Sequence, residues 1–331
     1  MDGFLTSPFI SKFPKNLKRT VFSGEGNFYD LFIAIKSGKL VAGVNGETFV
    51  DLLSQLRETD PELFHQFHSL EQAGKLQAKK AGHVIPENLK KIALRKSVLK
   101  SIGQGYSQPA HSIFHDDVGD SEKKKEVIKI GGKPLIDNED LDTGSVDHLF
   151  HEKSFPLNLG DTFNWARFLT KYISPFTHIR ILDPYLFTNI EKADLNNLLT
   201  ALLRQSNADT LSIEIISDLE SDDKWRKVEV IEKLRRELNI PKQFRKSLYL
   251  YHQKGSGSNV FHKRAIWTNF WTLLTERGFD FLKLETGKGT VTRENTLFLT
   301  GKYSSESSLW HQIDSNWKDY LGKAELISNL I

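Results

Sequence analysis

The second half of the chain contains the stretch Phe261-His262-Lys263-Arg264-Ala265-Ile266-Trp267-Thr268-Asn269. Its polar positions form the pattern H-x-R-x4-N, made by His262, Arg264 and Asn269. In an extended strand, His262 and Arg264 point to the same face because side chains alternate with a period of two. The glycines and serines of residues 255–259 predict a loop directly before this strand. We therefore expect a pocket wall that carries an imidazole, as nucleophile or acid, beside a cation able to bind phosphate.

Short apolar segments upstream of this stretch predict three more strands, with helices between them. The expected strands cover residues 178–185, 211–217 and 248–251, and the expected helices cover 161–172 (capped by Asp161), 193–204 and 223–238. Strands that alternate with helices are typical of an α/β layer with a mostly parallel sheet flanked by helices. Ligands of such sheets bind beyond the strand ends, which places Asp183 and the loop at 253–259 near the expected pocket.

The first half of the chain is expected to form a separate, smaller domain, because a length of 331 residues suggests two domains as a prior. This N-terminal domain, residues 1–150, is expected to be mixed and helix-rich, and the second domain covers 151–331. The expected elements of the first are an irregular segment over 1–22, an apolar run over 28–35 that is either a strand or a buried helix, helices over 47–56, from Asp60-Pro61 onward and from Pro86 onward, and a linker-like stretch over 103–150 with one short strand at 127–130.

The composition is that of a soluble globular protein, with 39% hydrophobic residues, 26% charged residues and a formal net charge of +3. Cysteine is absent, which excludes disulfides and thiolate metal sites and fits a reducing cytosol, so we expect a cytoplasmic protein. The first residues show no secretory pattern, and no run of about eighteen apolar residues predicts a membrane span.

Two features of the first half leave alternatives open. Residues 75–100 contain eight Lys or Arg, whereas 116–147 have an excess of acidic residues. The basic block either forms solvated helix faces or a surface for nucleic acid or phosphate. His65, His68 and Glu71 follow one another at intervals of three on one expected helix, a spacing that fits either a metal site or ordinary helix surface.

The H-x-R-x4-N pattern resembles the H-x-K-x4-D signature of the phospholipase D superfamily, with Arg264 in place of Lys and Asn269 in place of Asp. Tyrosyl-DNA phosphodiesterases similarly accept Asn at the last position. The pattern is more similar to the phospholipase D-like C-terminal domain of MIT-domain proteins, which also has Arg at the second position. That family shows two further segments in the same order, an I-x-D-P-Y strand end and a G-x-G-x-D-[YF]-F-like segment. The similar stretches here are Ile181-Leu182-Asp183-Pro184-Tyr185 and Arg277-Gly278-Phe279-Asp280-Phe281, so the resemblance covers roughly residues 160–331.

The resemblance implies a phospholipase D-like domain with phosphodiester chemistry. In active members a histidine attacks phosphorus to form a phosphohistidine, a second histidine protonates the leaving oxygen, and a cation neutralises the non-bridging oxygens. By this resemblance His262 is the nucleophile, Arg264 the cation and Asn269 an orienting group. The residues expected to contact substrate are Lys263, Asp183, Tyr185, Ser258 and His252. The chemistry requires no metal, so no cofactor is expected.

The sequence contains one copy of the pattern, whereas the chemistry uses two histidines. Family members with one motif form homodimers in which two sites make one active centre, so a homodimer is expected. His252 and His311 are the alternatives within this chain.

Two functions are compatible with these features. The first is a metal-independent nuclease, because the basic block suits nucleic acid; Trp267, Phe270 and Trp271 would then either stack on bases or form core. By analogy with bacterial anti-phage effectors, the N-terminal domain would recognise a trigger or dock a protein partner. The second is a degenerate phospholipase D-like module that binds anionic lipid, nucleic acid or a protein partner without turnover, which the departures at Arg264 and Asn269 favour.

Overall fold

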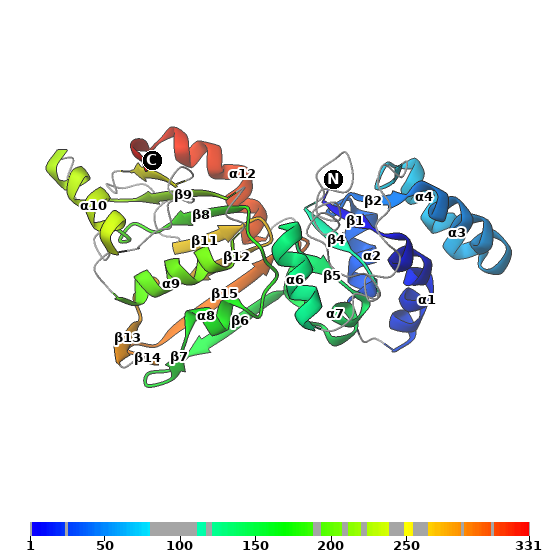
Figure 1. Cartoon of the computed structure of the whole chain (residues 1–331), viewed down its shortest axis with the longest axis horizontal. Helices are drawn as coiled ribbons and strands as arrows, with labels where there is room; N and C mark the ends of the chain where they lie inside the picture. The colour runs from blue at the N-terminus through cyan, green and yellow to red at the C-terminus, as the bar shows by residue number, and fades with distance from the viewer. Residues whose placement is uncertain are drawn as a thin grey trace. The chain divides into compact units, whose positions relative to one another are not determined.

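Two units of the chain, Met1–Phe150 and His151–Ile331, each have a sheet and a buried core of their own. The computed structural model describes residues 2–23, 26–79, 111–116, 121–187, 193–206, 211–219, 224–237, 248–253, 264–285, 288–305 and 308–330 (Figure 1). No described helix is long and apolar enough to cross a membrane.

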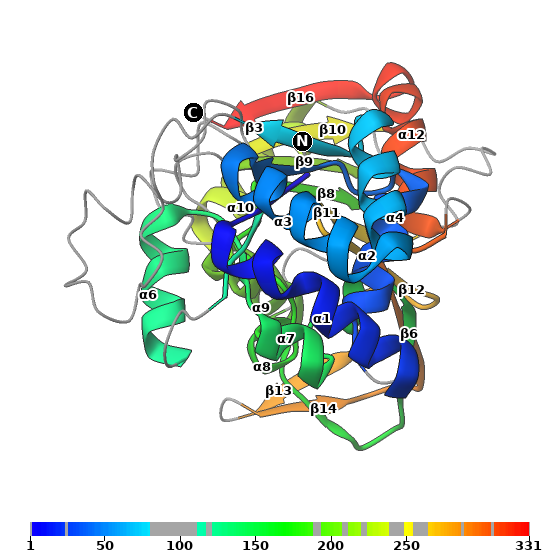
Figure 2. The same ribbon diagram turned by 90° about the vertical axis from the view of Figure 1, so that its right-hand side faces the viewer.

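The first unit is built on a parallel five-stranded sheet in the order β3-β2-β1-β4-β5. Its elements are β1 (Gly3–Leu5), α1 (Ser7–Ser23), α2 (Phe28–Ser37), β2 (Ala42–Asn45), α3 (Gly46–Thr59), α4 (Pro61–Gln72), β3 (Leu76–Lys79), β4 (Ser112–Phe114), α6 (Ser121–Gly131), β5 (Leu135–Ile136), α7 (Asn138–Thr143) and the 3-10 turn η2 (Asp147–Leu149). Figure 2 shows α1, α3 and α4 side by side over this sheet.

Local capping explains where the helices of this unit begin. The Asn45 side chain accepts a hydrogen bond from the Thr48 N–H at 3.2 Å and starts α3. Asp60 likewise accepts from the Leu63 N–H at 3.2 Å, with Pro61 in the first turn of α4. The predicted helix start at Asp60-Pro61 is therefore confirmed.

A cluster of phenylalanines forms the centre of the first core. Phe9 and Phe13 lie four residues apart on α1 and therefore share one face of that helix. The Phe13 ring centroid is 5.7 Å from that of Phe9, 6.2 Å from Phe28 and 6.0 Å from Phe67. All four rings are fully buried, so this cluster joins α1 to α2 and α4.

Three predictions for the first unit are wrong. Residues 1–22 are not irregular but form β1 and α1, because Pro8 occupies the first helical turn, where its missing N–H costs nothing. Residues 127–130 belong to helix α6 rather than a strand, since a short apolar run is outweighed by the helix-forming residues before it. The described part of the stretch 103–150 is not a linker, because β4 and β5 are strands of the sheet. The run at 28–35, left open between strand and helix, lies in α2.

The second unit contains an eight-stranded mixed sheet in the order β16-β10-β9-β8-β11-β12-β15-β6, and a three-stranded sheet, β13-β14-β7. Its elements are β6 (Glu152–Leu157), β7 (Thr162–Phe163), α8 (Trp165–Leu169), β8 (His178–Leu182), α9 (Ala193–Arg204), β9 (Ser212–Ser217), α10 (Lys224–Glu237), β10 (Leu248–His252), β11 (Arg264–Thr268), β12 (Trp271–Thr275), β13 (Leu282–Glu285), β14 (Lys288–Val291), β15 (Asn295–Gly301), α12 (Leu309–Gly322) and β16 (Glu325–Leu330).

The strands predicted near 178–185, 211–217, 248–251 and 261–269 are confirmed as β8, β9, β10 and β11, and the helices at 193–204 and 223–238 as α9 and α10. The α/β class is confirmed, but a mostly parallel sheet is wrong for this unit. β8, β9 and β10 are parallel, whereas every other neighbouring pair of the large sheet is antiparallel. The single long helix predicted at 161–172 is also wrong: Asn164, not Asp161, caps a short α8 after β7.

The two faces of the large sheet pack against different helices. Leu182, Ala265 and Trp267 pack with Trp310, Ile313 and Trp317 of α12. Because side chains alternate along a strand, Ile179 and Ile181 of β8 point to the other face, where they meet leucines of α9. Trp267, Phe270 and Trp271 are each at most 5% exposed, so the structure makes them core residues and not a base-stacking platform.

The phenylalanine cluster gives a test of the first core. Removing the Phe13 ring leaves a cavity between three helices, so Phe13→Ala should lower the free energy of unfolding by about 3–5 kcal/mol. Phe22 of the same helix is 88% exposed, against 0% for Phe13, and provides the matched control. Phe22→Ala should change stability by less than about 0.5 kcal/mol. Urea unfolding followed by circular dichroism measures both; equal effects of the two substitutions would contradict this packing.

Candidate functional site

The pairing of β8 with β11 brings two charged residues together at one edge of the large sheet. Leu182, the last residue of β8, lies opposite Ala265, the second residue of β11, in antiparallel register. The next position in this register sets Arg264 opposite Asp183, so the two residues are neighbours on adjacent strands. Since Ala265 faces α12, Arg264 points to the opposite face, on which α9 lies.

A cavity of about 290 Å³ opens at this edge. The residues that line it come from the end of β8, from α9, from the start of β11 and from the segments before β13 and β15: Asp183, Tyr185, Leu186, Leu195, Arg264, Arg277, Gly278, Phe279, Asp280 and Arg293. Three guanidinium groups and two carboxyl groups thus face one space. The excess of positive charge favours an anionic ligand.

The Arg264 guanidinium contacts the Tyr185 ring. Its central carbon lies 4.8 Å from the centroid of the Tyr185 ring, a cation–π distance. Among the residues that the structure describes, no side chain accepts a hydrogen bond from Arg264 or forms an ion pair with it. Within the described part of the chain, the planar fork of this side chain is therefore available for bidentate binding of an oxyanion.

Asp183 is the buried acid of the cavity, with 4% of its surface exposed. Its Oδ1 accepts a hydrogen bond from the Tyr185 N–H at 2.9 Å, which makes an Asx turn at the end of β8. Burial raises the pKa of Asp183 to about 6; the bond from Tyr185 and the charge of Arg264 oppose this shift without cancelling it. The carboxyl group can therefore donate or accept a proton near neutral pH.

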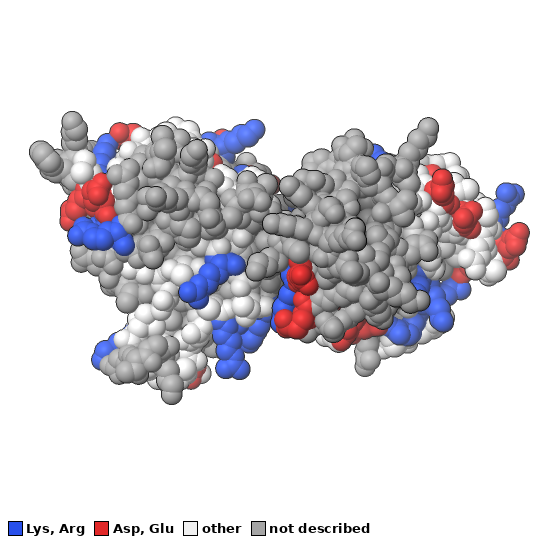
Figure 3. All heavy atoms as spheres, in the orientation of Figure 1, with Lys and Arg blue, Asp and Glu red and all other residues white. Residues whose placement is uncertain are grey.

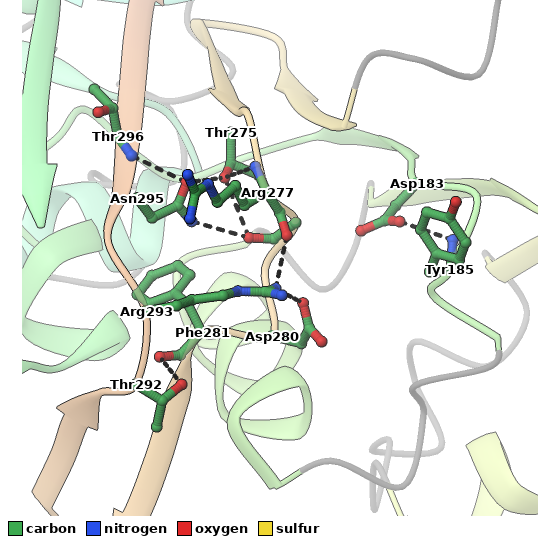
Figure 4. Close-up of polar contacts among 11 residues, drawn as sticks. Asp183, Tyr185, Thr275, Arg277, Asp280, Phe281, Thr292, Arg293, Asn295 and Thr296 are labelled. Atoms are coloured by element: carbon green, nitrogen blue, oxygen red, sulfur yellow. Dashed lines mark hydrogen bonds and ion pairs between the residues drawn. The ribbon is translucent and has the colours of Figure 1, made fainter. Parts of the chain in front are cut away.

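The opposite side of the cavity is formed by an ion pair of Arg293 with Asp280 (Figure 4). The same Arg293 Nη2 donates to the carbonyl oxygen of Arg277 at 2.6 Å. Beneath them, the buried Asn295 Nδ2 donates to the carbonyl oxygen of Gly278 at 3.1 Å, and Thr275 Oγ1 donates to Asn295 Oδ1 at 2.9 Å. This network fixes the segment that faces Asp183.

Gly278 is required by the geometry of this segment. Its φ of +90° lies in the left-handed region, which side chains rarely allow. A Cβ at this position would lie 3.2 Å from Arg264 Nη1 and 3.0 Å from Asp280 Oδ1. The absent side chain therefore lets the Arg264 guanidinium approach the backbone of the opposite side.

The structure places two of the expected site residues far from Arg264. Asn269 follows the other end of β11, about 16 Å from Arg264 at the rise of a strand, and its Oδ1 accepts from the Thr177 N–H at 3.0 Å. This hydrogen bond secures the segment before β8. Asn269 does not line the cavity, so the prediction that it belongs to the pocket is wrong. His311 is next to Trp310, whose Nε1 donates to the Thr268 carbonyl oxygen at the same distant end.

His252 lies at the correct edge of the sheet but outside the cavity. It pairs with Ser217, two strands away from Asp183, a separation of about 10 Å. The side chain is 4% exposed, and its Nδ1 accepts from the Leu219 N–H at 3.2 Å. His252 therefore supports the loop after β9 rather than contacting a ligand of the cavity.

Of the remaining expected residues, Asp183 and Tyr185 line the cavity, whereas His262, Lys263 and Ser258 lie outside the described residues. Arg277, Asp280 and Arg293 complete the site and are not among the site residues expected from the sequence. Residues 277–281 could have been predicted to belong to the site, since they form one of the segments that resemble the phospholipase D-like family. No sequence pattern indicates Arg293, because it lies in the short connection between β14 and β15.

No metal site accompanies this cavity in the part of the chain that the structure describes, where no group of three His, Asp or Glu is placed to hold an ion. His68 on α4 uses its ring nitrogens locally: Nδ1 lies 3.4 Å from Glu71 Oε2, and Nε2 is 3.0 Å from Gln72 Nε2. The spacing of His65, His68 and Glu71 therefore belongs to ordinary helix surface.

Comparison of the sequence with models of known protein families gives no match, and comparison with curated proteins gives none either.

The buried acid gives a pH-dependent prediction for stability. The pKa of Asp183 rises from 3.8 to about 6 on folding, which costs on the order of 3 kcal/mol when the carboxyl is ionised. Because the folded-state pKa is raised, this group favours folding below pH 4 and loses that contribution as the pH rises through 6. Asp183→Asn keeps the acceptor for Tyr185, so it should stabilise the protein by up to about 3 kcal/mol at pH 8 and by less than about 1 kcal/mol at pH 4.

Urea unfolding at the two pH values measures this difference. Asp319→Asn, at an exposed position of α12, is the matched control and should show no such dependence. A gain from Asp183→Asn that is the same at pH 4 and pH 8 would contradict the proposed burial of charge.

Proposed function

We propose that the second unit is a phospholipase D-like phosphodiesterase that acts on nucleic acid without a metal. The observation that carries the proposal is the pairing, in one cavity, of the Arg264 guanidinium, which no described side chain engages by a hydrogen bond or an ion pair, with a buried Asp183 carboxyl whose pKa is raised to about 6. The first group suits a phosphate anion, and the second suits proton transfer near neutral pH. The sequence resemblance around His262 supports the same reaction class.

In the proposed binding mode, the non-bridging oxygens of a phosphodiester contact Arg264, and the exposed Arg277 adds a second positive charge. Guanidinium groups that are fixed before substrate binds stabilise the charge that develops on phosphorus oxygens without reorganisation. The Tyr185 ring and the backbone at Gly278 provide this fixation for Arg264.

In the proposed reaction, a ring nitrogen of His262 attacks phosphorus, and the bond between phosphorus and the leaving oxygen breaks. The protonated Asp183 carboxyl gives its proton to that oxygen. Water then attacks the phosphohistidine and gives a proton to the Asp183 carboxylate, which restores both groups. Asp183 thus takes the place of the second histidine, and a homodimer brings two such cavities into one assembly without being required for proton transfer.

A second function is favoured by the observation that no described histidine lines the cavity. The unit would then bind phosphate groups of nucleic acid or anionic lipid without cleaving them. It predicts saturable binding that is lost in Arg264→Ala, with no product formed.

Cleavage assays with fluorescent single- and double-stranded DNA and RNA in the presence of EDTA test the enzyme directly. Arg264→Ala should lower kcat/KM by about 100- to 1,000-fold, because one charge-stabilising group is lost. Arg264→Lys should recover part of the activity, since it keeps the charge but not the bidentate fork. Arg57→Ala, at an exposed position of α3, is the control and should change nothing. Activity that survives His262→Ala or Arg264→Ala would rule the proposal out.

The pH profile of kcat/KM tests the role of Asp183. A general acid with a raised pKa of about 6 is protonated below that pH, so activity should fall as the pH rises through 6. In Asp183→Asn the rate should drop by about 100-fold or more, and this limb of the profile should disappear. A profile that is unchanged in shape by Asp183→Asn would assign proton transfer to another group.

A further inference from the structure

A second cavity, of about 230 Å³, lies between α8, α9 and β13 of the same unit. Phe163, Trp165, Leu282 and Leu284 form apolar walls, and Asn197, Thr200 and Arg204 come from α9. No part of the reaction described above uses this cavity.

Trp165 is among the residues that line the cavity, and its indole N–H lacks an acceptor among the described residues. Trp165 is 2% exposed. Buried indole N–H groups usually find a partner, since an unpaired buried donor is destabilising.

Aromatic side chains form part of the cavity lining. The Phe163 ring is half-buried and held by edge contacts, with its centroid 4.9 Å from that of Trp165 and 5.6 Å from that of Phe281. A flat ring between such side chains gains stacking and burial without ordering new side chains.

The polar side of the cavity is a stripe on one helix. Asn197, Thr200 and Arg204 are spaced by three and four residues on α9, so they share one face, while Leu198, Leu199 and Leu202 are buried in the core. An amide and a hydroxyl at the rim offer both donors and acceptors, as the edge of a heteroaromatic ring requires.

Arg204 lines this cavity, and two further cations lie on or just after the neighbouring helix α8. Arg167 and Lys171, at and after the end of α8, and Arg204 are exposed and form no ion pair with any described residue. Figure 3 shows Lys and Arg side chains gathered on the surface over α8 and α9. The ligand therefore combines a flat ring with a negative charge, which is the chemistry of a nucleotide.

The two cavities border the same helix and the same chain segment. Leu195 lines the first and Thr200 the second, five residues along α9, a rise of about 8 Å. Phe279 and Leu282 lie on one segment and line the first and the second cavity respectively. The two cavities therefore border different faces of one helix and different parts of one segment.

We infer that the cavity between α8, α9 and β13 binds an unstacked nucleobase, so that the preferred ligand is single-stranded nucleic acid or a free nucleotide. The inference rests on the proposed function for the phosphate in the first cavity. The binding of a base in the second cavity is independent of that function. The base must be unstacked, because a duplex base pair cannot enter a cavity of this size.

Fluorescence anisotropy of labelled single strands, measured on the full chain in EDTA and in the His262→Ala background, tests this inference. The probes are a single strand of about 12 nucleotides that carries all its bases (the normal strand), an abasic strand of equal length and a duplex. Thr200→Trp fills the cavity and should weaken binding of the normal strand about 10-fold or more. Its effect on the abasic strand should be less than about 2-fold. Arg204→Glu, at an exposed position, should weaken binding of the normal strand more than does the control Lys318→Glu on α12.

The variants separate this inference from the proposed function. Arg264→Ala should weaken binding of the normal and the abasic strand alike. If it weakens binding of neither, the proposed phosphate site is wrong, and the other variants still decide the base site. Equal affinity of the normal and abasic strands in the unsubstituted cavity, or no effect of both Thr200→Trp and Arg204→Glu, would overturn the base site. Calorimetric titration with AMP distinguishes a strand from a free nucleotide as the ligand. Binding of AMP that is lost in Thr200→Trp would show that the cavity binds free nucleotides as well.

Discussion

The antiparallel pairing of β11 with β8 is the constraint on which the candidate site depends. It places the start of one strand beside the end of the other, so that Arg264 and Asp183 become neighbours although they are far apart in sequence. β9 and β10 extend the same edge by parallel pairing, while β12 adds Thr275 opposite Arg264. A slip of one residue in β11 would turn Arg264 toward α12 and remove it from the cavity.

Electrostatics give this edge its chemical character. Burial penalises the charged form of Asp183 more strongly than Arg264 compensates it, and the pKa of the carboxyl therefore stays near 6. Arg293 is engaged by Asp280, whereas Arg264 keeps its donors available in the described part of the chain. Within the described residues, the cavity thus contains a paired cation that shapes it and a second cation whose donors are available for a ligand. Destabilisation by the buried acid is the stability cost of such a site.

Much of the secondary structure could be predicted from local pattern, whereas the site could not be completed in this way. The apolar runs at β8, β9, β10 and β11 and the capping at Asp60 are local signals, and these predictions are confirmed. The direction of β11 depends on which strand it pairs with, which no local pattern reveals, so the mostly parallel sheet was wrong. Asn269 was assigned by spacing alone, but a five-residue strand carries it to the opposite edge. Arg293 joins the cavity only through tertiary packing of a loop.

The central claim is that the cavity beside Asp183 and Arg264 binds a tetrahedral oxyanion. Tungstate mimics phosphate and scatters anomalously, so a crystal of the full chain soaked in tungstate locates such a site directly. The account predicts an anomalous peak within hydrogen-bond distance of the Arg264 guanidinium, and its loss in crystals of Arg264→Ala. An empty cavity, with tungstate bound at other surfaces of the protein, would contradict it.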